Sequence, residues 1–163
     1  DVTSMELQVY LPHVAESFVE RTQQQQQRLL IQIPQELPAL TTHLPYLERI
    51  VTELLQNACK YTPPGETIIL SAGNTSDVFV IDVCNSGVEI SSTEYDRIFE
   101  KFYRIPNHDP WKHGGTGLGL ALVKTMVERL EGSIVVSGSH QPRMTRFTVR
   151  LPANRSACCE PLA

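Results

Sequence analysis

The chain has 163 residues, of which 41% are hydrophobic and 20% charged, and its formal net charge is −4 at pH 7. This length suits a single domain with a sizeable core, and the acidic balance excludes the basic surface with which nucleic-acid-binding domains hold phosphates. No apolar stretch approaches the roughly 20 residues of a membrane span, and the start does not resemble a signal peptide. We therefore expect one soluble domain over residues 1–152 and a frayed tail over 153–163.

The four cysteines indicate a reducing setting. Cys59, Cys84, Cys158 and Cys159 include no CxxC pair, so we expect no zinc site, and the vicinal pair in the tail has poor geometry for a structural disulfide. Disulfides are rare in the cytosol, so this pattern favours a cytoplasmic domain. The missing initial Met indicates a piece of a longer protein that is either membrane-anchored or soluble.

Hydrophobic periodicity and turn residues predict the elements in chain order. They are a helix over 5–27 with Pro12 as a candidate start, strands over 29–33 and 39–42, a helix over 45–61, strands over 67–72 and 78–84, a short helix over 93–99, a long loop over 103–113, a helix over 118–130, and strands over 133–137 and 145–151. Strands grouped into hairpins beside helices predict an α+β fold. We expect a two-layer α/β sandwich whose mixed, mostly antiparallel sheet carries its helices on one face.

A glycine cluster, Gly114-Gly115-Thr116-Gly117-Leu118-Gly119-Leu120, leads into the last predicted helix. Glycines let backbone amides approach an anion closely, and the positive end of the helix dipole points to the same place. The cluster lacks the Lys-Ser or Lys-Thr pair of a Walker loop and the βαβ setting of a dinucleotide fold. Alone it is equally compatible with a phosphate site and with a glycine-rich turn before a core helix.

The helix predicted over 45–61 carries a second candidate site. Glu53, Asn57, Lys60 and Tyr61 follow one another at i, i+4, i+7 and i+8, so they share roughly one face. The opposite face is apolar and should pack inward; it consists of Ile50, Val51, Leu54, Leu55 and Ala58. An Asn with a carboxylate one turn away suits Mg²⁺, which takes oxygen ligands and keeps several waters. Alone this face is also compatible with an ordinary charged helix surface.

Four segments together resemble the sensor histidine kinases. Glu-Leu-Leu-Gln-Asn-Ala-Cys-Lys-Tyr-Thr (53–62) resembles their asparagine box, and Asn-Ser-Gly-Val-Glu-Ile (85–90) their first glycine box. Ile-Phe-Glu-Lys-Phe-Tyr-Arg (98–104) resembles their phenylalanine box, and the glycine cluster their second glycine box. The segments keep the family's order and spacing, and the wording from Tyr103 to Thr116 is similar to cyanobacterial members. The resemblance covers roughly residues 7–151 and implies the Bergerat ATP-binding α/β sandwich shared with gyrase, Hsp90 and MutL.

This resemblance implies a role for each matching residue. Asn57 would bind Mg²⁺ through its side-chain oxygen, Lys60 would lie near the phosphates of ATP, and Tyr61 would lie beside the adenine. Asn85 and Gly87 would lie at the adenine base of the nucleotide. The remaining residues implied at the nucleotide are Tyr103, Arg104, Gly115, Thr116, Gly117, Leu118, Gly119 and Leu120.

The resemblance also implies tasks for the glycine cluster and for the two phenylalanines of the phenylalanine box. The glycines would let the backbone approach the phosphates, and Thr116 would donate a hydrogen bond there. Leu118 and Leu120 would anchor the turn in the core. Phe99 and Phe102 would pack the base of the loop, a candidate lid, against the core.

Glu53 and two departures from the family's pattern leave alternatives open. Glu53 could act as a general base, as the acid that polarises a phosphoacceptor imidazole, or as a support of the hydrated metal. Asn85 replaces the family's adenine-reading Asp; its amide oxygen can still accept from the adenine amino group, and the amide can also flip. Glu89 replaces a glycine and puts a side chain where the backbone normally runs close to the nucleotide.

The resemblance implies that the domain transfers the γ-phosphate of Mg·ATP to a histidine. None of the five histidines of the chain lies in an H-E-x-R/K-T-P-like context, so we expect the phosphoacceptor upstream, on a dimerisation domain. The expected partners are that domain and a response regulator, in a homodimeric full-length protein, with this fragment monomeric. Two alternatives remain: a degenerate nucleotide-sensing or docking module without turnover, and an ATPase that uses Glu53.

Overall fold

The computed structural model describes residues 1–106 and 117–153 of the chain. Its elements are β1 (Thr3–Met5), α1 (Leu7–Glu16), α2 (Val19–Gln24), β2 (Arg28–Gln32), β3 (Leu40–Thr42), α3 (Leu44–Tyr61), β4 (Thr67–Thr75), β5 (Val78–Ser86), a 3₁₀ turn (Ser92–Glu94), α4 (Gly119–Arg129), β6 (Ser133–His140) and β7 (Arg143–Pro152).

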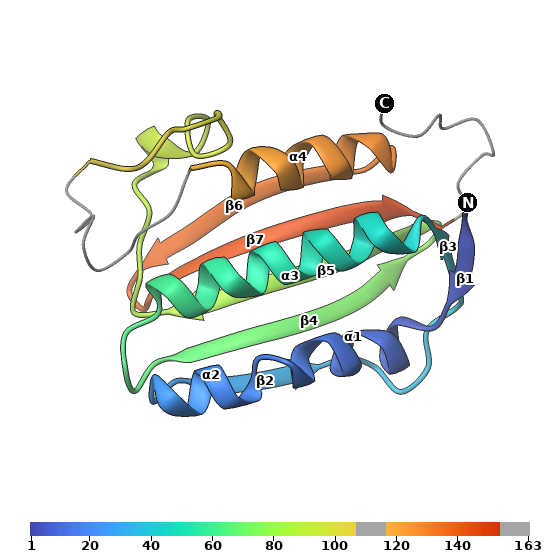
Figure 1. Ribbon diagram of the computed structural model, residues 1–163, viewed down its shortest axis with the longest axis horizontal. Helices are drawn as coiled ribbons and strands as arrows, with labels where there is room; N and C mark the ends of the chain where they lie inside the picture. The colour runs from blue at the N-terminus through green and yellow to red at the C-terminus, as the bar shows by residue number, and fades with distance from the viewer. Residues whose placement is uncertain (107–116, 154–163) are drawn as a thin grey trace.

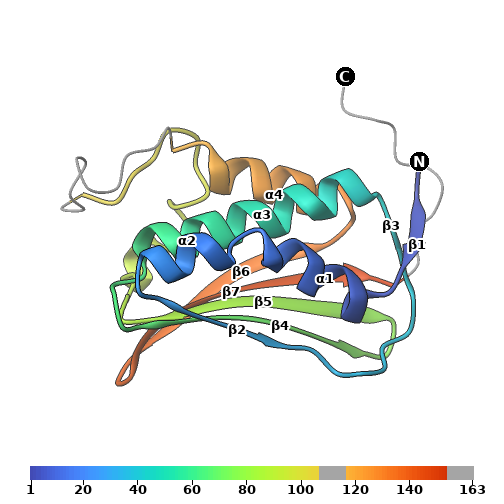
Figure 2. The same ribbon diagram turned by 60° about the horizontal axis from the view of Figure 1, so that its bottom comes forward.

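These elements form two layers. The main sheet has the strand order β2-β4-β5-β7-β6, and among its described pairs only β2 and β4 run parallel. The helices cover one face of this sheet (Figures 1 and 2). The predicted two-layer α+β sandwich with a mixed, mostly antiparallel sheet and helices on one face is therefore confirmed.

The core lies between the layers, because alternate strand residues face the helices. Ile81 lies opposite Val149 and Val83 opposite Phe147 in the β5–β7 register, and all four are at most 3% exposed. The apolar face predicted for α3 packs onto this surface, as residues 50, 51, 54, 55 and 58 are also at most 3% exposed. Full burial of one such aliphatic side chain stabilises the fold by about 1.5–3 kcal/mol.

The ends of two helices and one strand meet at one end of the two layers. The C-terminal ends of α3 and β5 and the N-terminal end of α4 lie there together (Figures 1 and 2). The segments assigned to motifs by sequence are thus brought side by side by the topology.

The predicted N-terminal helix over 5–27 is wrong in its extent. α1 begins at Leu7, so Pro12 lies inside it rather than at its start. The helix ends at Glu16, and α2 begins only at Val19. The hydroxyl of the intervening Ser17 donates to the Val14 carbonyl at 2.8 Å, a local bond that competes with helix continuation. Met5 belongs instead to β1, which pairs with β3 and is too short to leave a periodic signal.

The short helix predicted over 93–99 is also wrong, since only a 3₁₀ turn over Ser92–Glu94 forms there. Part of the long predicted loop, 107–116, lies outside the described residues, as does the tail from 154, so the predicted domain boundary at 152 stays a prediction. Within the described ranges, no helix combines the length and apolar character that crossing a bilayer requires.

Candidate functional site

α3 presents Glu53, Asn57 and Lys60 on one partly exposed face, as their spacing predicts. The helix begins at Leu44-Pro45, where a proline costs no helical hydrogen bond. It ends at Tyr61 with the amide of Thr62 donating to the Ala58 carbonyl at 3.0 Å. The polar face therefore leads directly to the end of the molecule where α4 and β5 meet it.

The Glu53 carboxylate lies between two helices. Its Oε1 pairs with Nη2 of Arg49 at 2.7 Å, and the side chain is only 16% exposed. Its Oε2 lies against the first residue of α4, because a Cβ added to Gly119 would meet it at 2.8 Å. A carboxylate is favoured at a helix N-terminus by the helix dipole. Glycine at 119 thus leaves room for an acid that faces the start of α4.

Positive charge gathers at the C-terminal end of α3. The pKa of Lys60 lies below its usual value, first because burial disfavours the ammonium form and then because Arg104 and Arg21 repel it. The Lys60 ammonium also lies 5.5 Å from the ring centroid of Tyr61. Burial raises the pKa of Tyr61, while Arg104 acts in the opposite direction. An anion near Lys60 and Arg104 would relieve this repulsion.

Asn85 is a buried amide at the end of β5. It is 6% exposed, and its Nδ2 donates to the hydroxyl of Thr62, the residue that ends α3, at 3.0 Å. In the sheet it lies opposite Ile68 of β4 and Thr145 of β7. The predicted base-contacting residue is therefore joined directly to the helix that carries Asn57 and Lys60.

Gly87 follows with φ of +77°, a conformation that glycine adopts without strain. A Cβ at this position would lie 2.6 Å from Cγ of Glu66. The same Glu66 accepts a 2.6 Å hydrogen bond from the Ser86 hydroxyl, which in turn accepts from the Thr67 amide at 2.9 Å. A side chain at 87 would be strained by this φ and would displace the Glu66 side chain.

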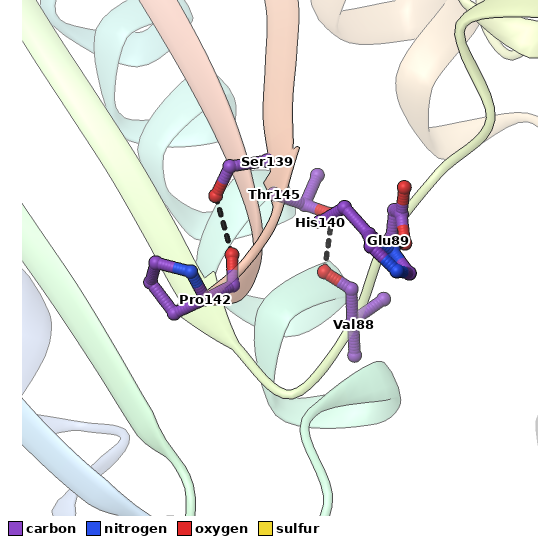
Figure 3. Close-up of polar contacts among 6 residues, drawn as sticks. All are labelled: Val88, Glu89, Ser139, His140, Pro142 and Thr145. Atoms are coloured by element: carbon purple, nitrogen blue, oxygen red, sulfur yellow. Dashed lines mark hydrogen bonds and ion pairs between the residues drawn. The ribbon is translucent and has the colours of Figure 1, made fainter.

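The residues after Gly87 are fixed against the β6–β7 hairpin. The carboxylate of Glu89 lies 2.7 Å from Nδ1 of His140, and the Thr145 hydroxyl donates to the Val88 carbonyl at 2.9 Å (Figure 3). Ser139 and Pro142 make a further contact within the hairpin (Figure 3). Glu89, which stands where the family has a glycine, thus directs its carboxylate to His140 on the hairpin.

The base of the long loop is closed by backbone contacts. The Phe102 amide donates to the Gly117 carbonyl at 2.9 Å, and a Cβ at 117 would lie 2.8 Å from the Phe102 carbonyl carbon. Phe99 packs edge-on against Phe147 with centroids 6.2 Å apart, as expected, but Phe102 is 70% exposed, so its predicted packing is wrong. The Tyr103 hydroxyl donates to Glu94.

The leucines of the glycine cluster differ in their surroundings. Leu120 packs against the core, as expected, whereas Leu118 is 37% exposed and so does not lie in the core as predicted. Gly115 and Thr116 lie outside the described residues, and so does Gly114.

Gln27 is a residue that the sequence did not single out. It is 7% exposed, and its Nε2 donates to the carbonyls of Cys59 at 2.8 Å and Thr62 at 2.6 Å. These carbonyls belong to the end of α3, where helices leave acceptors unpaired. As the last member of a run of glutamines, Gln27 gives no sequence signal other than its place directly before a strand.

A metal here would depend on few protein ligands. Among the described residues, no cluster of three or more His, Cys, Asp or Glu side chains could hold a metal ion. The oxygens of Asn57 and Glu53 fit Mg²⁺, which usually binds through one or two protein oxygens together with waters and substrate phosphates.

The chain is similar in sequence to proteins of a known family. Residues 43–155 match the family model described as histidine kinase-, DNA gyrase B-, and HSP90-like ATPase. The sensor histidine kinase CusS of Escherichia coli (strain K12) is 37% identical over 107 residues, which are 66% of this chain and 22% of that protein. The sensor histidine kinase RppB of Synechocystis sp. is 34% identical over 106 residues, 65% of this chain and 23% of that protein. The chain thus spans less than a quarter of either relative.

Solved structures show the same fold. The nucleotide-free catalytic domain of histidine kinase ThkA has a TM-score of 0.82 at 17% identity and covers 96% of this chain and 99% of its own. Full-length ShkA in complex with AMPPNP has a TM-score of 0.83 at 22% identity, over 98% of this chain and 33% of its own. The chain therefore belongs to the histidine kinase-, DNA gyrase B- and HSP90-like ATPase family, among the ATP-binding catalytic domains of sensor histidine kinases.

Proposed function

We propose that this domain binds Mg·ATP at the end of α3 and transfers the γ-phosphate to a histidine on a separate dimerisation domain of its full-length protein. The observation that supports the proposal is that α3, which carries Asn57 and Lys60, is hydrogen-bonded through Thr62 at its C-terminal end to the buried Asn85 and faces the start of α4 through Glu53. Polar groups that suit a metal, phosphates and a base thus gather at one end of the fold.

In this proposal each residue has a task in positioning and charge stabilisation, which dominate phosphoryl transfer. Lys60 and Arg104 neutralise phosphate charge, and Gly117 and Gly119 allow the backbone to come close to it. Asn85 contacts the base and Tyr61 covers it. Bound Mg²⁺, held by Asn57, would offset charge on the phosphate oxygens.

Glu53 supports a second candidate function, ATP hydrolysis. Its carboxylate faces the start of α4 and is held by Arg49, so it is placed to act as a base toward water or toward an imidazole. Hydrolysis by the isolated domain that disappears in Glu53→Gln would favour the ATPase. Glu53→Gln with unchanged hydrolysis would exclude it.

The proposed partners follow from the family. ThkA has been solved in complex with the response regulator TrrA, and its structure in that complex has a TM-score of 0.79 to this chain at 18% identity. We infer a cognate response regulator, a homodimer formed through the phosphorylated dimerisation domain, and a cytoplasmic position of the catalytic domain.

Transfer in trans tests the proposed function. The domain is mixed with γ-labelled Mg·ATP and the histidine-bearing dimerisation domain of its own full-length protein. We expect label on that domain only when both parts are present, and less label with Lys60→Met. Absence of label together with nucleotide binding would support instead a sensing module without turnover.

A further inference from the structure

The base-contacting position of this chain carries an amide instead of the carboxylate of the family's pattern. We propose that the site accepts 6-oxopurine nucleotides as well as adenine nucleotides, because the Asn85 amide can present either an acceptor or a donor to position 6 of the base. This inference rests on the nucleotide-binding function proposed above.

The contact between Asn85 and Thr62 permits both orientations of the amide. In the structure Nδ2 of Asn85 donates to Oγ1 of Thr62 at 3.0 Å, which leaves Oδ1 as the atom turned away from Thr62. A hydroxyl both donates and accepts, so Thr62 can rotate its proton and donate to Oδ1 when the amide is reversed. The reversal therefore exchanges one hydrogen bond for another of the same kind.

The neighbouring groups do not oppose this reversal. The backbone amide and carbonyl of Thr62 are engaged with Ala58 and Gln27, so the hydroxyl is the part of Thr62 that remains adjustable. The Thr145 hydroxyl, across the sheet from Asn85, already donates to the Val88 carbonyl. Among the described residues, the Asn85 side chain makes one hydrogen bond, to this rotatable hydroxyl, so a ligand can set the orientation of the amide.

The chemistry of the bases then decides what binds. Adenine carries a 6-amino group, which donates to Oδ1 of Asn85 in the orientation that the structure has. Hypoxanthine carries a 6-oxo group, which accepts from Nδ2 once the amide is reversed. A carboxylate at position 85 has only acceptors and would oppose a 6-oxo group. A buried group left facing a mismatched partner weakens binding by about tenfold to a hundredfold.

Binding of Mg·ATP and Mg·ITP by calorimetry tests the inference, since the two bases differ at position 6 and the adjoining N1. We expect the wild-type dissociation constants to agree within about tenfold and Asn85→Asp to weaken Mg·ITP binding relative to Mg·ATP by a further tenfold or more. Comparing the two ratios isolates residue 85, because other differences between the bases cancel. Asn74→Asp, an exposed amide at the far end of β4, is the matched control and should leave the ratio unchanged.

The outcomes separate this inference from the proposed function. Tight Mg·ATP binding with Mg·ITP more than a hundredfold weaker in the wild type overturns the inference and leaves the nucleotide site standing. Binding of neither nucleotide at millimolar concentration overturns both. If Asn85→Asp does not fold, the ratio of Mg·ATP to Mg·ITP affinity in the wild type still tests the inference.

Discussion

Replacing Gln27 with leucine removes the hydrogen bonds that tie the α2–β2 turn to the end of α3. Leucine has nearly the same size, so the packing volume is kept while the Cys59 and Thr62 carbonyls lose their buried donor. Each unsatisfied buried acceptor costs about 1–3 kcal/mol. The change also removes Oε1 of Gln27, which is buried without a partner among the described residues, and this returns roughly 1 kcal/mol.

With two acceptors left unpaired, the net loss in the free energy of unfolding should be about 1–5 kcal/mol, with a central value of about 2–3 kcal/mol. Urea unfolding followed by circular dichroism measures it, and with a slope near 2 kcal/mol/M the midpoint should fall by roughly 1 M. Gln23→Leu is the matched control, because Gln23 belongs to the same glutamine run but is exposed on α2. Equal stabilities of the two variants would refute the role assigned to Gln27.

Three further predictions concern the site and the core. Gly119→Ala should displace the Glu53 carboxylate and weaken phosphotransfer severalfold with little loss of stability, since the atom that must move is the end of a flexible side chain. Nucleotide affinity, measured by calorimetry, should fall as pH rises through the pKa of Lys60, which burial and the nearby Arg104 and Arg21 hold below its usual value. Alkylation read by mass spectrometry should spare Cys59 and Cys84 in the folded state, because burial raises the pKa of both thiols.

The sign of the pH effect follows from linkage. Bound phosphate favours the charged ammonium, so the complex has a higher Lys60 pKa than the free domain and holds its proton at pH values where the free domain loses it. Affinity is therefore full below the free-state pKa and declines above it, and Lys60→Met should abolish the decline. A decline that persists in Lys60→Met would contradict the assignment.

The Gly119→Ala and cysteine alkylation experiments each have an outcome that would contradict the prediction. Gly73→Ala adds a methyl group into open space on β4 and should leave transfer unchanged. If Gly119→Ala retains full transfer, the position of Glu53 against α4 does not matter for function. If the buried cysteines react as fast in the folded domain as in urea, their burial is not maintained in solution.

Residue patterns predicted the parts of the fold that repeat along an element. The 3.6-residue spacing on α3 separated Asn57 and Lys60 from a buried face, and the strand patterns over 78–84 and 145–151 located β5 and β7. Contacts between distant segments left no such trace. The pairing of Met5 with Leu40, the bonds from Gln27 to the end of α3 and the contact of Glu89 with His140 each join residues far apart in sequence.

The resemblance to the sensor histidine kinases assigned Asn57, Lys60 and Asn85 to one site but said nothing of their arrangement. The link from Asn85 through Thr62 to α3 required the structure. The motifs also gave no indication that Phe102 and Leu118 would be exposed, because large apolar side chains are usually buried.

In the proposed function, Asn57 holds the metal of a bound nucleotide. The most direct test is calorimetric titration of a non-hydrolysable ATP analogue into the domain with Mg²⁺ and with EDTA, for the wild type, Asn57→Ala and the exposed control Asn74→Ala. We predict that the wild type and the control bind the analogue at least tenfold more tightly with Mg²⁺ than with EDTA. Asn57→Ala should bind it with the same affinity under both conditions. Equal, Mg²⁺-dependent binding by Asn57→Ala would contradict the account.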